Sequence, residues 1–158
     1  MRLKLIAVLA GGLIAGMVIQ AAAFGGTAAD IRKPVTVHVI EHALTDTVTD
    51  TGAAGDTTGD LLTFHNPVFN AADTGQVGRD QGECTRIAVG ASWECTWTTF
   101  LPGGQITVEG PFSDTGNTVL AITGGTGSYR NARGFMELIY HDAAGTRFDF
   151  VFHLHGEG

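Results

Sequence analysis

The stretch from Gln105 to Gly134, QITVEGPFSDTGNTVLAITGGTGSYRNARG, carries the signals that decide the fold. Two runs rich in β-branched residues, Ile106 to Val108 and Thr118 to Ile122, are each bounded by Gly, Pro, Asn or Asp, which is typical of antiparallel strands joined by turns. The second run leads into the glycine-rich segment Gly124 to Gly127. A phosphate-binding glycine loop has to open a helix within a βαβ unit, and the residues that follow here have a strand pattern instead. We therefore do not interpret this segment as a nucleotide site.

The strand pattern continues on both sides of this stretch. Turn residues recur at near-regular spacing, and after the N-terminal segment apolar residues never keep a helical period over three turns. Eight strands are expected, at residues 35–43, 61–69, 82–87, 93–100, 105–109, 118–123, 135–141 and 147–155. Eight short strands without a helix indicate an all-β sandwich or barrel.

In the last expected strand one face is apolar and consists of Phe148, Phe150, Phe152 and Leu154. Alternation along a strand places these side chains together, so this face is buried. The sequence leaves open whether it faces a lumen, a helix-covered flank or a subunit interface.

Three blocks follow one another in a specific order, namely GDLLTFHNPVF at residues 59–69, GRDQGECTRI at 78–87 and GGTGSYRNARG at 124–134. Together they resemble the barrel family that contains plant allene oxide cyclases and dirigent proteins. The resemblance extends from about Val35 to Leu154. It implies a closed eight-stranded antiparallel β-barrel, lipocalin-like in outline, whose interior is filled or holds one small ligand. It also implies a homotrimer.

The N-terminal segment has the three parts of a secretory signal peptide: a basic start with Arg2 and Lys4, an apolar run from Leu5 to Ile19, and small residues before Phe24. We expect cleavage after Ala23 and a secreted protein. Residues 24–34 would then form a connector and residues 35–158 a single barrel domain, without stable membrane insertion. The alternative is an N-terminal membrane anchor, because the apolar run is close to the minimum length of a spanning helix.

The chain is acidic, with a formal net charge of −7, and Lys33 is the only lysine beyond the predicted signal peptide. Such a chain repels phosphate backbones, so we predict that it does not bind nucleic acid. The negative charge favours solubility.

The two cysteines, Cys84 and Cys95, can face each other across a hairpin. A turn at Val89 and Gly90 places them at opposite positions of neighbouring strands, where a disulfide is geometrically possible. An exported protein also meets oxidising conditions. We predict a disulfide, and a free thiol at Cys84 is the alternative.

Glu41 occupies the fourth place on a strand face that is otherwise apolar, after Val35, Val37 and Val39. If this face lines a lumen, burial raises the pKa of the carboxyl group and lets it handle a proton or orient a substrate. If the strand end is solvated, Glu41 has no such role. Asn66 shares a face with apolar neighbours, where its amide needs a partner in the protein, in water or in a ligand.

The allene oxide cyclases similarly carry a Glu on an early strand, an Asn at the end of the first block and a Cys before the hairpin. The resemblance therefore implies that Glu41, Asn66 and Cys84 line the pocket as catalytic residues. Two departures limit this assignment. Ala43 stands where the cyclases have a second Asn, and Cys84 has a potential disulfide partner.

The segment TDTVTDTGAAGDTTGD, residues 45–60, contains four aspartates but does not match an EF-hand loop. We expect a solvated loop, which can cover the mouth of a barrel. Histidines pair on strand faces, as His153 and His155 do, yet no third ligand lies at a diagnostic spacing, so no metal is predicted. No motif implies a cofactor.

Two functions fit these observations, and the sequence does not decide whether the protein is an enzyme. One is a cyclase or isomerase that holds a small hydrophobic substrate in one conformation while a ring closes. The other is a non-catalytic barrel that binds a hydrophobic ligand or guides coupling, as dirigent proteins do. A filled structural barrel without a ligand is a third possibility.

Overall fold

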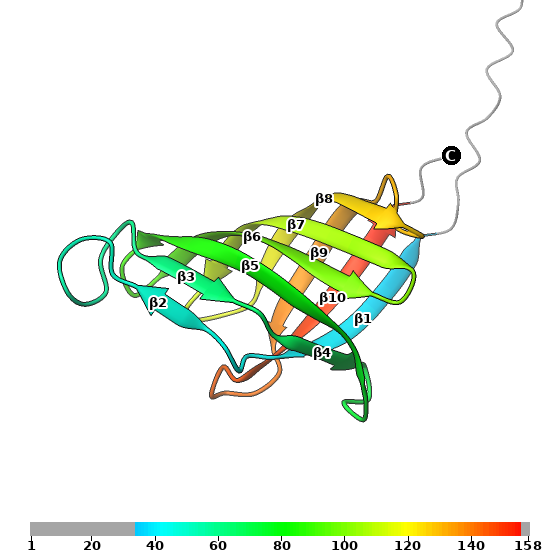
Figure 1. Ribbon diagram of the computed structural model, residues 1–158, viewed down its shortest axis with the longest axis horizontal. Helices are drawn as coiled ribbons and strands as arrows, with labels where there is room; N and C mark the ends of the chain where they lie inside the picture. The colour runs from blue at the N-terminus through cyan, green and yellow to red at the C-terminus, as the bar shows by residue number, and fades with distance from the viewer. Residues whose placement is uncertain (1–33, 156–158) are drawn as a thin grey trace, which may run out of the picture.

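Ten strands run through residues 34–155, the part of the chain that the computed structural model describes (Figure 1). They are β1 (Val35–His42), β2 (Thr47–Thr49), β3 (Leu61–Phe64), β4 (Pro67–Asn70), β5 (Gln76–Ala88), β6 (Ser92–Leu101), β7 (Gly104–Ser113), β8 (Thr118–Gly127), β9 (Arg133–Tyr140) and β10 (Arg147–His155). The predicted signal peptide, residues 1–23, lies outside the described residues. Among the residues described, no helix is long and apolar enough to cross a membrane.

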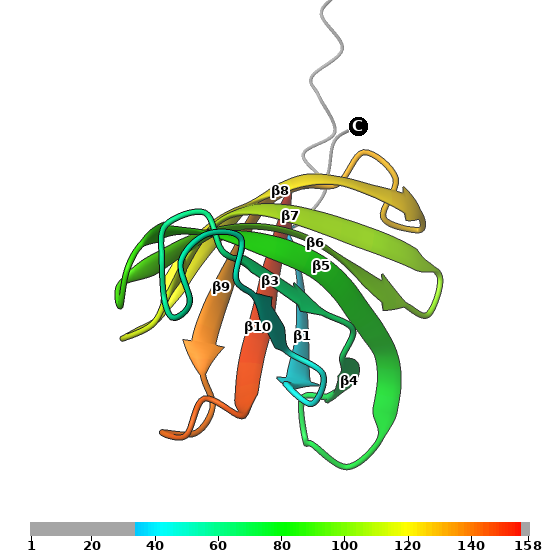
Figure 2. The ribbon, with the colours of Figure 1, turned by 60° about the vertical axis from the view of Figure 1, so that its left-hand side comes forward.

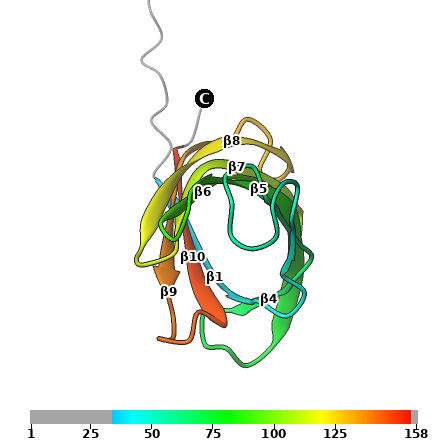
Figure 3. The ribbon, with the colours of Figure 1, turned by 90° about the vertical axis from the view of Figure 1, so that its left-hand side faces the viewer.

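Antiparallel pairing closes these strands into a barrel (Figures 2 and 3). The sheet order is β2-β3-β5-β4-β1-β10-β9-β8-β7-β6, and β5 also pairs with β6. β3 and β4 pair with successive parts of β5, while β2 and β1 flank them on the other side. Around the barrel, β3 and β4 together take the place of one strand, and β1 and β2 together take the place of another, so the ten strands form eight positions. The result is the closed eight-stranded antiparallel barrel that the sequence predicts.

The strand boundaries differ from the prediction around β3, β4 and β5. The predicted strand at residues 61–69 is interrupted at His65 and Asn66, and β5 begins at Gln76 rather than at Gly82. The first half of β5 contains the polar run Arg79 to Gln81 and few β-branched residues, so the sequence pattern does not predict a strand there. Pairing with β4 and β6 nevertheless keeps it extended, because barrel closure satisfies its backbone groups.

The segment predicted as a solvated loop, residues 45–60, is also partly ordered as strand, since it contains β2. The rest of it crosses the opening at one end of the barrel (Figure 3). Asp60 is fully buried and accepts hydrogen bonds from the backbone N–H groups of Thr51 and Thr57. Asp56 forms an ion pair with Arg86 at 2.7 Å, which attaches the loop to β5.

The apolar face of β10 points into the barrel. Phe150 and Phe152 are at most 1% exposed, and the ring of Phe150 lies 5.5 Å from the ring of Trp97 on the opposite wall, centroid to centroid. The same interior receives Trp93 and Cys95 of β6. The question that the sequence left open is thus settled in favour of the lumen.

The glycine-rich segment belongs to the end of β8 and leads through a turn into β9, so it does not open a helix. A Cβ atom at Gly125 would collide with the backbone oxygens of Tyr129 and Gln105. The glycine is needed because two backbone segments approach closely, not because a phosphate binds. Arg133 donates hydrogen bonds to the carbonyl oxygens of Thr123 and Ala132 and so stabilises this hairpin.

Gly82 offers a test of how tightly the wall is packed where β5 meets β6. It pairs with Trp97, and a Cβ atom at Gly82 would collide with the Cβ of Trp97 and with the carbonyl oxygen of Thr96. We expect Gly82→Ala to lower the free energy of unfolding by about 1–3 kcal/mol in guanidinium chloride denaturation. Gly124→Ala is the matched control, because a Cβ atom there meets nothing within 4 Å. Equal stabilities of the two variants would contradict the close packing at Gly82.

Candidate functional site

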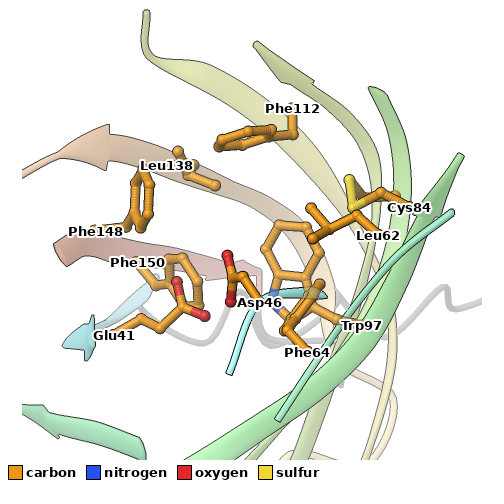
Figure 4. A pocket seen from close by; sticks show the side chains of 11 residues that line it. Glu41, Asp46, Leu62, Phe64, Cys84, Trp97, Phe112, Leu138, Phe148 and Phe150 are labelled. Atoms are coloured by element: carbon orange, nitrogen blue, oxygen red, sulfur yellow. A yellow bond between two sulfur atoms is a disulfide. The ribbon is translucent and has the colours of Figure 1, made fainter. Parts of the chain in front are cut away.

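The barrel encloses a cavity with an aromatic wall and an acidic end (Figure 4). The cavity contains about 360 Å³ of space that no atom occupies, and part of this space is open to solvent. The volume available to the centre of a water molecule is smaller, about 40 Å³. The lining residues are Glu41, Asp46, Leu62, Phe64, Cys84, Cys95, Trp97, Phe112, Leu138, Phe148 and Phe150. The cavity is therefore largely apolar, with carboxyl groups on one side.

Glu41 lies at the end of β1, next to Phe148 of β10 in the strand register. It is 6% exposed. Removal from water raises the pKa of its carboxyl group well above the usual value, the negative charge of Asp80 raises it further, and a hydrogen bond from Asn66 opposes the shift. Glu41 accordingly holds a proton at pH values where an ordinary glutamate is ionised. Of the two interpretations of Glu41 from the sequence, the structure supports the buried one.

Asn66 is fully buried, and its side-chain amide connects the acidic residues. Its Nδ2 donates to Glu41 Oε1 and to Asp46 Oδ1, both at 2.7 Å. Its Oδ1 accepts hydrogen bonds from the backbone N–H groups of Leu44 and Thr45, each at 2.9 Å. Both amide hydrogens are thereby engaged within the protein. Asn66 does not line the cavity but positions the two carboxyl groups that do.

Asp80 on β5 is a third acidic residue at this end, and it is fully buried. Desolvation raises its pKa to about 7, against the lowering effect of the backbone N–H of Asn66, which donates to Asp80 Oδ1 at 3.2 Å. Its Oδ2 has no hydrogen-bond partner among the described residues. Two neighbouring buried carboxyl groups, Glu41 and Asp80, thus both favour the protonated form.

Asp46 and Asp80 are site residues that the sequence pattern does not indicate. Asp46 was assigned to the solvated loop, but the break between β1 and β2 places it at the cavity mouth, where its side chain is exposed. Asp80 was outside the predicted strand 82–87. Had that strand been extended to Gln76, alternation would have placed Asp80 on the same face as Cys84.

Cys84 and Cys95 form the predicted disulfide, and both line the cavity. They pair directly in the register of β5 and β6, as expected for a hairpin that turns near Val89 and Gly90. Since no thiol exists at Cys84 in this state, the resemblance to a cyclase with a pocket thiol does not extend to that residue. The disulfide contributes an apolar, sulfur-rich part of the wall instead.

Metal binding finds no support in the described part of the chain, where no group of three or more His, Cys, Asp and Glu side chains is placed to hold an ion. Four histidines, His38, His42, His141 and His153, contact carboxylates on other elements. His38 and His141 both contact Asp149, at 2.7 and 2.9 Å, and His153 contacts Glu137 at 2.9 Å.

The chain is an all-β closed barrel with an apolar lumen and a few buried polar groups, an architecture that in other proteins encloses small ligands. The chain belongs to the allene oxide cyclase barrel like domain family, whose model matches residues 40–150. By fold it stands among cyclase-type and dirigent-like barrels. The resemblance inferred from the three sequence blocks is thereby confirmed.

Solved structures with the same fold include three with different described activities. A pyocyanin demethylase is 26% identical, with 75% of this chain and 100% of that chain covered and a TM-score of 0.63. A pterocarpan synthase dirigent protein is 18% identical, with 81% and 99% covered and a TM-score of 0.68. An exo-specific intermolecular Diels-Alderase is 17% identical, with 79% and 100% covered and a TM-score of 0.63. Because one fold serves several activities, the activity of this chain has to be argued from its site.

Proposed function

We propose that this barrel takes a small hydrophobic substrate into its lumen and promotes cyclisation or isomerisation by conformational control, with Glu41 as the proton-handling residue. The observation that carries the proposal is a buried carboxyl group held at the end of an aromatic cavity. Cyclase-type barrels among the similar structures support the same class of reaction.

The physical basis is pre-organisation. The aromatic wall excludes water and restricts an apolar chain to few conformations, which lowers the entropic part of the barrier to ring closure. Glu41 lies where its proton can be donated to an oxygen on which negative charge develops. Asn66 fixes the carboxyl group through the 2.7 Å hydrogen bond and acts as a positioning residue.

A non-catalytic barrel that binds a hydrophobic ligand or guides coupling is the second candidate. One specific observation favours it: the disulfide between Cys84 and Cys95 removes the pocket thiol that the cyclases have. In this case Glu41 orients a ligand by a hydrogen bond without transferring a proton.

Glu41→Gln separates the two candidates. We expect the variant to convert a fatty-acid epoxide or polyketide substrate at least tenfold more slowly, because an amide keeps the shape of the side chain but cannot donate an acidic proton. Product formation is followed by mass spectrometry. Glu137→Gln is the matched control, since Glu137 is 44% exposed and pairs with His153 outside the lumen. If Glu41→Gln retains full turnover, Glu41 does not handle a proton; if no substrate turns over but lipid extracts contain a co-purified apolar ligand, the binding function is supported.

We further propose that the protein is secreted after cleavage at Ala23, that residues 24–34 act as a connector and that the mature barrel associates as a homotrimer. The disulfide supports an oxidising environment. Mass spectrometry of the exported protein tests the cleavage site, and light scattering tests the oligomeric state.

A further inference from the structure

The two tryptophans of the barrel differ in what their indole N–H groups contact. Trp93 Nε1 donates to Asp114 Oδ1 at 3.0 Å, and the guanidinium group of Arg86 lies 3.8 Å above its ring. Trp97 is equally buried, at 3% exposed, but its Nε1 has no acceptor among the described residues. Of the two indoles, only that of Trp97 lines the cavity.

A buried donor without an acceptor destabilises a protein, and in native structures such a donor calls for a specific explanation. The ring of Trp97 is held between two phenylalanines, edge to face with Phe64 at 6.0 Å and tilted against Phe150 at 5.5 Å. In Figure 4 the indole lies beside the cavity between Phe64, Leu62 and the carboxyl group of Asp46. Packing against these rings therefore restricts the orientation of the indole, and its nitrogen is itself shielded from solvent.

We propose that Trp97 Nε1–H recognises an uncharged oxygen acceptor, of carbonyl or ether type, on an apolar ligand in the lumen. This inference rests on the proposed function, because it requires that the lumen admits a ligand. It adds the chemical class of that ligand and a specificity-determining residue.

The surroundings of Trp97 decide against a charged ligand group. Among the described residues, the only other polar side chains that line the cavity are those of Glu41 and Asp46, and no described Lys or Arg lines it. An anionic ligand group would meet the negative charge of Asp46 without a compensating cation. An uncharged oxygen can accept the hydrogen bond without this repulsion, while the aromatic rings pack against the rest of the ligand.

The test uses the full-length protein and a matched pair of probes, fluorenone and fluorene, which share a flat apolar frame and differ in one carbonyl oxygen. Because the chain has two tryptophans, a nitrogen-15 NMR spectrum contains two indole N–H signals. We expect fluorenone to move the Trp97 signal and leave the Trp93 signal in place, and fluorene to move backbone signals of the lumen with little effect on the Trp97 indole.

Trp97→Phe keeps an aromatic ring and removes the N–H group. We expect it to reduce the preference for fluorenone over fluorene by roughly five- to tenfold, the effect of one hydrogen bond. Trp93→Phe is the control. It loses the hydrogen bond to Asp114 and is expected to be less stable, but it keeps the preference for the ketone. Denaturation of both variants shows whether a change in binding merely follows a change in stability.

The outcomes separate this inference from the proposed function. If fluorenone and fluorene bind equally well, or if the ketone leaves the Trp97 signal unchanged, the inference is wrong while ligand binding in the lumen stands. If neither probe binds, and the smaller pair cyclohexanone and cyclohexane does not bind either, both the inference and the proposed function are wrong.

Discussion

Asn66→Ala is expected to lower the free energy of unfolding by about 3–5 kcal/mol, as measured by guanidinium chloride denaturation. The substitution removes hydrogen bonds to Glu41 and Asp46 and leaves the backbone N–H groups of Leu44 and Thr45 without their acceptor. Each bond contributes about 1 kcal/mol, and buried groups left unpaired add a desolvation cost. The loss should be accompanied by faster hydrogen exchange at Leu44 and Thr45.

Asn70→Ala is the control for this prediction. Asn70 also bonds through both ends of its amide, but its partner is the nearby Thr74 on the barrel exterior. We expect this variant to lose only about 0.5–1.5 kcal/mol. A similar loss in both variants would mean that Asn66 is an ordinary turn residue, not the residue that organises the acidic end of the cavity.

The second large effect is an unusual dependence of stability on pH. We expect the free energy of unfolding to fall as the pH rises from about 4 to about 6, by up to about 1.4 kcal/mol per pH unit from Asp80, with a contribution of the same sign from Glu41. Acid would thus stabilise the barrel in this range, which is the opposite of the behaviour of most surface carboxylates.

The free energy of unfolding falls with rising pH because the pKa values of both carboxyl groups are higher in the folded state than in the unfolded chain. Asp80 releases its proton near 3.8 in the unfolded chain but retains it up to about pH 7 in the barrel, and the pKa of Glu41 is also raised by burial. Between these values the folded state binds more protons than the unfolded state, so the stabilisation present below the unfolded pKa is lost as the pH rises through the folded pKa. Asp142 acts in the opposite direction, because hydrogen bonds from Thr146 lower its pKa, but its effect lies at more acidic pH.

The double variant with Glu41→Gln and Asp80→Asn is expected to flatten this slope. Thermal or chemical denaturation at several pH values, with the native protein and the double variant measured side by side, cancels the contributions of all other groups. Parallel profiles for the two proteins would show that neither carboxyl group is held protonated by the fold. A variant with Glu137→Gln should follow the native profile, since Glu137 is partly exposed and lies outside the lumen.

Several features of the site could be predicted from local sequence. Glu41 was recognisable because it continues the apolar series of Val37 and Val39, and the cysteine pair because one hairpin register places Cys84 opposite Cys95. Asp46 and Asp80 were not recognisable. The burial of Asp80 and the position of Asp46 at the cavity mouth depend on strands that are distant in sequence, and the neighbours of both residues along the chain are polar, as in any solvated segment.

By itself, the sequence determined that the chain is all-β and that Cys84 can face Cys95, because alternation, turn chemistry and hairpin register act over a few residues. The closed eight-stranded barrel and the family followed from the resemblance carried by the three sequence blocks. Only the tertiary structure decided that the phenylalanine face of β10 points into the lumen, that Asn66 is saturated by protein partners and that Trp97 presents an unpaired N–H group. These properties arise from barrel closure, which brings β1, β5, β6 and β10 around one cavity and removes their polar groups from water. No local pattern records which distant strand will supply, or fail to supply, a hydrogen-bond partner.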